Sequence, residues 1–203
     1  MKWILILFFI AALFSCEQTK NSSTYAETKQ LVQFNVFDTA NHLQPQFGKA
    51  KFDSLHAFDF GWALLEPINL AKNRNDDKEL SKRFSRGQKA LYFIWYLDEQ
   101  VTNGGFVQFY LNDYREYILP IKDGLKLIGD TATLSLVERA DNEYLTHQRF
   151  VDSYKNKSDW QPLYDASYGF SEFDSIYYVR HIKMMEFLEK YARQNSNEFV
   201  KFK

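Results

Sequence analysis

The fold is decided by one stretch near the middle of the chain, Leu91–Asn112, with the sequence LYFIWYLDEQVTNGGFVQFYLN. Taken locally, Asn103-Gly104 between two aromatic runs is a strong signal for a β-hairpin. A helical interpretation competes well, because Asp98-Glu99-Gln100 is poor strand material and the aromatic residues after the glycines step by three and four positions. In a helical chain, Asn103, Gly104 and Gly105 would end one helix with positive φ angles and let the next begin almost at once.

Part of this stretch also carries a family motif. The matching residues are Asn103, Gly104, Gly105, Phe106, Gln108, Phe109 and Asn112. With them the chain resembles the DNA-mimic protein family, whose hallmark is Asn-Gly-Gly-Phe followed by a Gln-Phe pair and an Asn. The flanks Ala90-Leu91, Ile94-Trp95 and Leu127-Ile128-Gly129 are similar as well, and the likeness covers roughly residues 80–140. The resemblance implies an all-α domain and favours helices over the hairpin.

Helical spacing precedes the motif. One stripe consists of Phe52, Leu55, Asp59, Trp62 and Leu65, in three-and-four steps, and it predicts a helix limited by Pro67. Asp76 and Asp77 are expected to act as N-terminal caps or dipole-favoured acids ahead of a long helix from about Glu79 to Val101. The side chains of Lys82, Arg83, Arg86 and Lys89 are expected to stay in solvent.

Further helices are predicted after the motif. Pro120 suits the first turn of a helix that Gly129 ends, and Asp130 or Thr131 can cap the next one. That helix should bury Leu136, Val137, Ala140, Tyr144 and Val151. A polar loop is expected over residues 153–170, before a last helix with the stripe Tyr177, His181, Met184, Leu188 and Tyr191.

The N-terminus has the composition of an export signal. Lys2 is the only charge before an unbroken apolar run from Trp3 to Phe14. A helix that spans a bilayer needs about 20 apolar residues, so the run is short for a membrane anchor and is typical of a signal peptide. The following Leu13-Phe14-Ser15-Cys16 resembles the lipobox of bacterial lipoproteins, although Phe14 is bulkier than usual there. We expect lipid on Cys16 to hold the mature protein at a membrane; an ordinary signal peptide with an incidental cysteine is the alternative.

Beyond the anchor, residues 17–30 are polar and predict a tether, and residues 31–37 alternate like a strand or an extended lead-in. Cys16 is the single cysteine, which excludes an intramolecular disulfide and a Cys-rich zinc site. Removal of residues 1–15 leaves 24 basic and 26 acidic side chains, so charge gives no case for nucleic acid as a partner.

The resemblance further implies a strongly acidic surface, since the family's namesake imitates DNA and occupies a transcription factor. This chain departs from that pattern in its nearly balanced charges. An exported lipoprotein would also not reach a cytoplasmic DNA-binding protein. DNA-mimic activity is therefore not expected here.

The motif admits two interpretations. Asn103, Gln108 and Asn112 could offer amide donors and acceptors in a ligand groove with aromatic walls. Alternatively the glycines serve a tight corner between helices and the aromatic residues are core, which we favour because Gly-Gly calls first for a backbone explanation.

Signals for catalysis or metal binding are weak. Glu143 and His147 lie one helical turn apart, where an exposed ion pair is the commoner arrangement and a metal would need more ligands. His181 lies within an apolar stripe and His56 flanks another, as hydrogen-bonded histidines at a core edge do. The sequence contains no His-Glu-x-x-His, no Gly-x-Ser-x-Gly and no Gly-rich phosphate loop.

The sequence thus predicts an all-α, single compact multi-helix domain at residues 51–203, behind a signal peptide at 1–15 and a lipid-anchored tether and lead-in at 16–50. The predicted function is a membrane-tethered, non-catalytic binding module for a protein or peptide partner in the cell envelope, without cofactors. The alternative is a lipid-anchored enzyme or metal-binding protein that uses His147, Glu143 or His181.

Overall fold

The longest of the described helices, α5 (Arg86–Leu111), contains the motif and lies at the centre of the domain. The computed structural model describes residues 40–166 and 169–203, so Cys16, the predicted signal peptide and the predicted strand at 31–37 lie outside the described residues. Leu91, Phe93, Ile94 and Leu97 of α5 are fully buried. Around α5 pack α3 (Ala57–Leu65), α6 (Ile118–Ile128), α7 (Thr131–Asp152) and α9 (Phe170–Gln194). The hairpin alternative is excluded, and the all-α prediction is confirmed.

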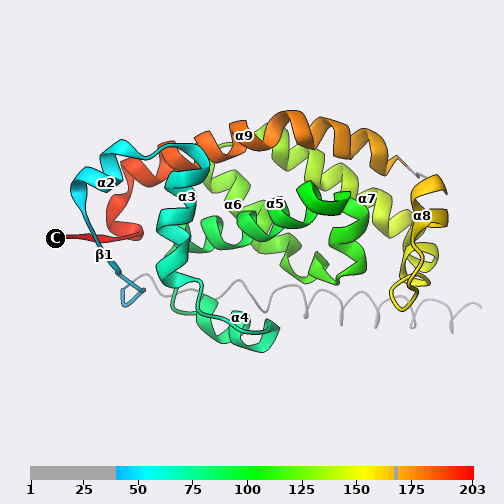
Figure 1. Cartoon of the computed structure of the whole chain (residues 1–203), viewed down its shortest axis with the longest axis horizontal. Helices are drawn as coiled ribbons and strands as arrows, with labels where there is room; N and C mark the ends of the chain where they lie inside the picture. The colour runs from blue at the N-terminus through cyan, green and yellow to red at the C-terminus, as the bar shows by residue number, and fades with distance from the viewer. Residues whose placement is uncertain (1–39, 167–168) are drawn as a thin grey trace, which may run out of the picture.

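The remaining elements are short. They are α2 (Lys49–Ser54), α4 (Arg74–Ser81), α8 (Gln161–Ala166) and the 3-10 turns η2 (Glu66–Ile68), η3 (Tyr114–Tyr117) and η4 (Ser196–Glu198). Strand β1 (Gln46–Phe47) pairs in parallel with β2 (Lys201–Phe202), which brings the start and the end of the described chain together. In Figure 1, α9 runs along the long axis over α5, and α8 lies at the end away from the C-terminus. Among the described helices none is long and apolar enough to cross a membrane.

Local signals after the motif work as predicted. Gly129 ends α6 with φ 80°, and Asp130 caps α7 by accepting a hydrogen bond from Thr133 N at 3.0 Å. The predicted inner residues of α7 are buried, and so are Tyr177, Met184 and Leu188 of α9. The expected loop at 153–170 is wrong in part, because α8 forms inside it and buries Leu163.

The predicted helix over residues 52–65 is broken, since α2 ends at Ser54 and α3 begins at Ala57, which has φ 44°. Distant side chains stabilise this break. Arg193 donates to Leu55 O and, at 2.7 Å, to Phe52 O, while Glu189 accepts from Ala57 N at 2.6 Å. Partners more than 130 residues away therefore satisfy the backbone groups that the break exposes.

The predicted helix from Glu79 to Val101 is also wrong at its start, because α4 ends at Ser81 and α5 begins at Arg86. Ser85 and Gln88 form a reciprocal capping box, a signal that the sequence contains. Arg83 and Arg86 are exposed as expected. Lys89 is not, with only 7% of its surface exposed, because it lies on the side of α5 that faces α6.

Candidate functional site

The Asn103–Asn112 motif forms a sharp corner inside α5. Gly104 has φ −154° and ψ 24°, and Gly105 has φ 74° and ψ −179°. Positive φ angles were predicted for Asn103, Gly104 and Gly105, and of these three residues Gly105 alone has one. The helical segment after the corner starts at Phe106, whose backbone N donates to Asp174 Oδ1 of α9 at 2.8 Å. A Cβ on Gly105 would collide with this carboxylate, whose Cγ would be 2.7 Å away. Asp174, which the sequence analysis missed, thus acts as the cap of the second segment.

The polar and aromatic residues of the motif separate. Phe106 and Phe109 are fully buried in the core. The side-chain amides form hydrogen bonds with one another toward the surface. Asn103 Nδ2 donates to Gln108 Oε1 at 3.0 Å. Gln100 Oε1 accepts from Gln108 Nε2 at 3.2 Å and from Asn112 Nδ2 at 2.8 Å. The motif therefore builds a corner whose outer side is a row of mutually bonded amides.

Two tyrosines of neighbouring helices form hydrogen bonds with the backbone of this corner. Tyr164 of α8 donates to Gly104 O at 2.9 Å, and Tyr178 of α9 donates to Thr102 O at 3.3 Å. Their side chains remain accessible, with Tyr164 38% and Tyr178 46% exposed. Large exposed aromatic rings thus stand beside the corner.

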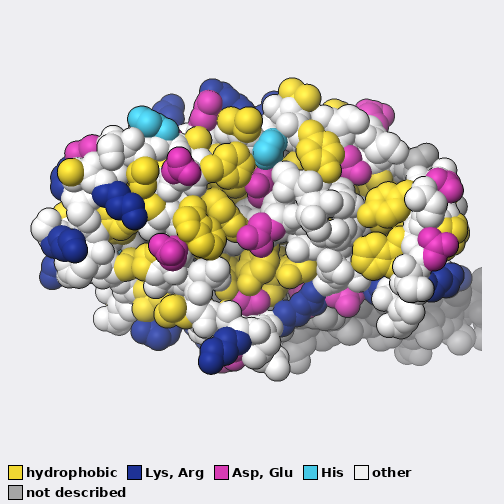
Figure 2. Space-filling view, viewed as in Figure 1, with side chains coloured by type: hydrophobic (Ala, Val, Ile, Leu, Met, Phe, Trp, Pro, Cys, Tyr) yellow, Lys and Arg dark blue, Asp and Glu magenta, His cyan; other side chains and the backbone are white. Residues whose placement is uncertain are grey.

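From Tyr178 an aromatic surface extends across α5 to α3. Trp62 of α3 lies 5.7 Å from Trp95 of α5 between ring centroids, and Phe58 lies 6.1 Å from Trp95 and 5.5 Å from His181 of α9. Trp62 is 43% exposed, although it belongs to the largely apolar stripe of the sequence. Figure 2 shows the hydrophobic side chains gathered over these helices, interrupted by acids.

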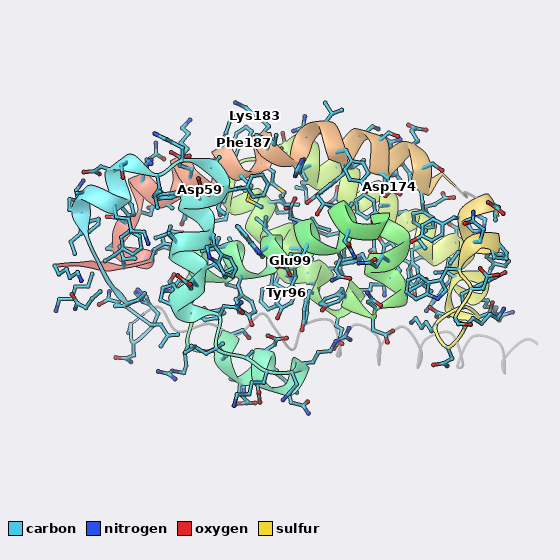
Figure 3. All side chains as sticks on the ribbon, viewed as in Figure 1. Asp59, Tyr96, Glu99, Asp174, Lys183 and Phe187 are labelled. Carbon is cyan, nitrogen blue, oxygen red and sulfur yellow. The ribbon has the colours of Figure 1, made fainter. Side chains whose placement is uncertain are left out.

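Three carboxylates accompany these rings. Figure 3 labels Asp59 on α3, Glu99 on α5 and Asp174 on α9, on the side of the molecule that carries the aromatic surface. Glu99 accepts a hydrogen bond from Trp95 Nε1 at 3.1 Å. Burial raises the pKa of Asp174, although the hydrogen bond from Phe106 N opposes the shift. We call this surface the aromatic–acidic face, and its residues are Phe58, Asp59, Trp62, Trp95, Tyr96, Glu99, Asp174, Tyr178 and His181.

His181 lies at the edge of this face, next to the buried carboxylate of Asp98. Its Nδ1 lies 3.3 Å from Asp98 Oδ1, which also accepts a hydrogen bond from Tyr177 at 3.1 Å. Burial raises the pKa of Asp98, while the nearby His181 and the Tyr177 hydroxyl act in the opposite direction. The side chain of His181 is 21% exposed, so it occupies the core-edge position that the sequence predicted.

Asp76 and Asp77 lie in the first turn of α4, where dipole-favoured acids were predicted, but Asn73 is the cap of this helix and Asp77 is only 3% exposed. Its carboxylate accepts hydrogen bonds from Tyr92, from Tyr96 at 3.2 Å and from Tyr117 at 2.6 Å. Burial raises the pKa of Tyr96 to about 12, so its hydroxyl stays a donor at neutral pH. Three donors offset the cost of burying one carboxylate, which gives this cluster a structural role beneath the face.

The other candidate polar residues form pairs. His147 Nε2 lies 3.4 Å from Glu143 Oε1 on α7, as the spacing predicted, and His56 Nδ1 lies 3.0 Å from Glu189 Oε1. In the part of the chain that the structure describes, no group of three or more His, Cys, Asp or Glu residues could hold a metal ion.

Comparison with known proteins finds a matching family model and a similar protein. The family model described as DMP19-like protein matches residues 82–195, which extends beyond the motif to the end of α9. A relative from Neisseria meningitidis serogroup B (strain ATCC BAA-335 / MC58), named DNA mimic protein DMP19, is 29% identical over 119 residues. These cover 57% of this chain and 72% of the relative.

Proposed function

Because the chain belongs to the DMP19-like protein family, we propose that it is a non-catalytic binding module that takes a protein or peptide partner on its aromatic–acidic face. The observation that carries the proposal is the exposure of Trp62 and Tyr178 on a fold that buries Phe106, Phe109 and most other large rings. Aromatic side chains are enriched at protein interfaces because they give a large contact area for little conformational entropy. Their concentration beside the family motif favours recognition over a purely structural role.

The chemistry of the face favours a basic partner. Asp59, Glu99 and Asp174 surround rings that can also attract a cation through their π faces. A Lys or Arg side chain on the partner could therefore contact a carboxylate and a ring together. The expected ligand is a segment with basic residues next to apolar ones.

This proposal differs from DNA mimicry, the property named for the Neisseria relative. Duplex DNA has one negative charge for about every 1.7 Å of its axis, so a mimic needs a large excess of acids. The whole chain has 26 acidic and 25 basic side chains. The two functions can be separated by competition, because a DNA mimic would release duplex DNA from the partner, whereas the proposed module binds without displacing it.

Affinity capture from the native envelope tests the face. We expect the wild-type protein to recover a partner that Trp62→Ala and Tyr178→Ala lose. Glu138→Ala, a change at an exposed position of α7, which contributes no residue to the face, serves as the matched control and should retain the partner. Identical recoveries from all four proteins would contradict the proposal. Phe106→Ala is unsuitable, because this residue is fully buried and its truncation would cost about 3–5 kcal/mol of stability.

We further propose that lipid on Cys16 tethers the module to a membrane of the cell envelope, on its periplasmic or cell-surface side. The proposal rests on the short apolar leader and the cysteine directly behind it. Mass spectrometry of the mature N-terminus should find an acylated Cys16, and Cys16→Ser should abolish the modification. An unmodified Cys16 in wild-type protein, or recovery wholly from the cytoplasm, would contradict it.

A further inference from the structure

A cavity of about 400 Å³ lies between α5 and α6, and none of its lining residues belongs to the aromatic–acidic face. The lining consists of Arg86, Lys89, Ala90, Pro120, Asp123, Gly124, Lys126 and Leu127. Gly124 permits a close approach of the two helices, since a Cβ there would lie 3.0 Å from Ala90 Cα. The volume of the cavity falls within the usual range of small-molecule sites.

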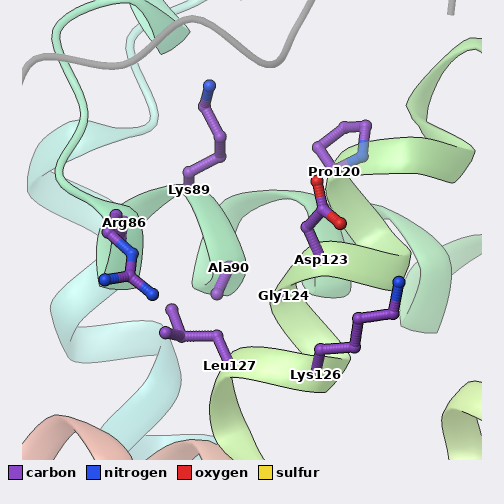
Figure 4. A pocket seen from close by; sticks show the side chains of 8 residues that line it. All are labelled: Arg86, Lys89, Ala90, Pro120, Asp123, Gly124, Lys126 and Leu127. Carbon is purple, nitrogen blue, oxygen red and sulfur yellow. The ribbon is translucent and has the colours of Figure 1, made fainter. Parts of the chain in front are cut away.

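The charged lining residues are mostly basic. The lining has three basic side chains, Arg86, Lys89 and Lys126, and a single carboxylate, Asp123. In the chain as a whole, acidic and basic side chains are nearly equal in number. In Figure 4, Arg86 and Lys126 lie on opposite sides of the cavity, and the side chain of Lys89 extends from α5 along its upper edge. A local excess of positive charge over apolar walls attracts an anion more strongly than the same charges in open solvent would.

The apolar part of the lining favours a ligand that also has an organic part. Ala90, Pro120 and Leu127 contribute apolar surface beside the basic groups. An inorganic anion would leave this surface without a partner, whereas an anion attached to a small organic group would cover it. Arg86 offers the planar fork of donors that suits a phosphate, and lysines bind phosphate as point charges.

We propose that this cavity is a binding site for a phosphate-bearing small molecule or headgroup, with the phosphate among Arg86, Lys89 and Lys126 and its organic part against Leu127. Lys89 is the buried member of the set. Burial lowers the pKa of Lys89 to about 8, although Asp123 opposes the shift, and a bound anion would favour the charged amine. Two sources provide this chemistry, a free organic phosphate and the headgroup of an anionic phospholipid.

Calorimetric titration of the purified full chain in a neutral detergent tests the site. The probes are inorganic phosphate, glycerol 3-phosphate and glycerophosphoglycerol, the deacylated headgroup of phosphatidylglycerol, with glycerol as the uncharged reference. The variants are Arg86→Gln and Lys126→Gln. Lys82→Gln is the matched control, because Lys82 pairs with Glu79 at 2.7 Å and lies outside the cavity.

We expect both organic phosphates to bind more tightly than inorganic phosphate, and each cavity variant to weaken binding about tenfold, as the loss of one charge-assisted hydrogen bond does. Lys82→Gln should leave the affinity unchanged. Tighter binding of glycerophosphoglycerol would assign the site to a lipid headgroup, and tighter binding of glycerol 3-phosphate to a free metabolite. The proposal is overturned if no phosphate binds at about 10 mM, or if Lys82→Gln weakens binding as much as the cavity variants do.

Discussion

Replacement of Gly105 by alanine tests the account of the corner in α5. At φ 74° and ψ −179°, a conformation that is essentially confined to glycine, a residue with a Cβ costs about 1–3 kcal/mol. The new methyl group would also displace the Asp174 carboxylate and weaken its cap on Phe106 N, a loss of about 0.5–2 kcal/mol. We expect Gly105→Ala to lower the free energy of unfolding by about 2–5 kcal/mol, which is a large part of a domain's typical stability.

Gly129→Ala is the reference for a glycine of positive φ without a collision. Gly129 has φ 80°, but nothing lies within 4 Å of a Cβ built there, so only the backbone cost of about 1–2 kcal/mol applies. The assay is urea denaturation of the full-length variants, with the slope of the unfolding free energy checked for constancy.

A double variant completes the test. In Gly105→Ala/Asp174→Ala the cap is lost only once, so the double change should cost about 1 kcal/mol less than the two single changes together. Equal costs for Gly105→Ala and Gly129→Ala, together with strictly additive single changes, would refute the collision with Asp174.

Three further outcomes are expected. Tyr117→Phe removes a donor from buried Asp77 and should cost about 1–3 kcal/mol in urea denaturation; a change within error would show that the remaining tyrosines suffice. Burial alone would raise the pKa of Glu189, but hydrogen bonds from Ala57 N, Arg193 and His56 hold this pKa below its ordinary 4.5. The unfolded chain therefore binds more protons in acid than the folded chain does, and stability should fall as pH drops below about 4.5. Glu189→Gln should flatten this acid-side loss, and an unchanged pH profile would disprove the assignment. Trp62→Ala should cost at most about 1.5 kcal/mol through its ring contact, so a larger shift of the urea midpoint would mean that Trp62 is part of the core.

Local sequence signals predicted the parts of the fold that depend on local interactions. Gly129 and Asp130 end one helix and start the next through groups within a few residues of each other. The positive φ at Gly105 also follows from a local requirement, since only glycine adopts this conformation without strain.

The remaining features depend on distant partners. The break before Ala57 relies on Glu189 and Arg193, and the start of α5 is held by Glu198, which accepts from Gly87 N at 2.6 Å. Asp77 resembles a surface acid in the sequence because the tyrosines that surround it come from later elements. No local pattern contains this information.

The candidate site shows the same division. The motif was visible in the sequence, and its corner could be predicted from Asn103-Gly104-Gly105. The exposure of Trp62 could not, because it depends on how α3 crosses α5. Asp174 likewise reaches the corner only through the packing of α9 on α5.

Site-specific photo-crosslinking in the native envelope tests the binding face most directly. A photoreactive phenylalanine derivative at position 62 would lie on the aromatic–acidic face, and the same group at position 138 would lie at an exposed position of α7. We predict a discrete crosslinked species of one defined mass from position 62, reduced by an added peptide of lysines and aromatic residues, and none from position 138. No adduct at position 62, or the same adducts from both positions, would contradict the account.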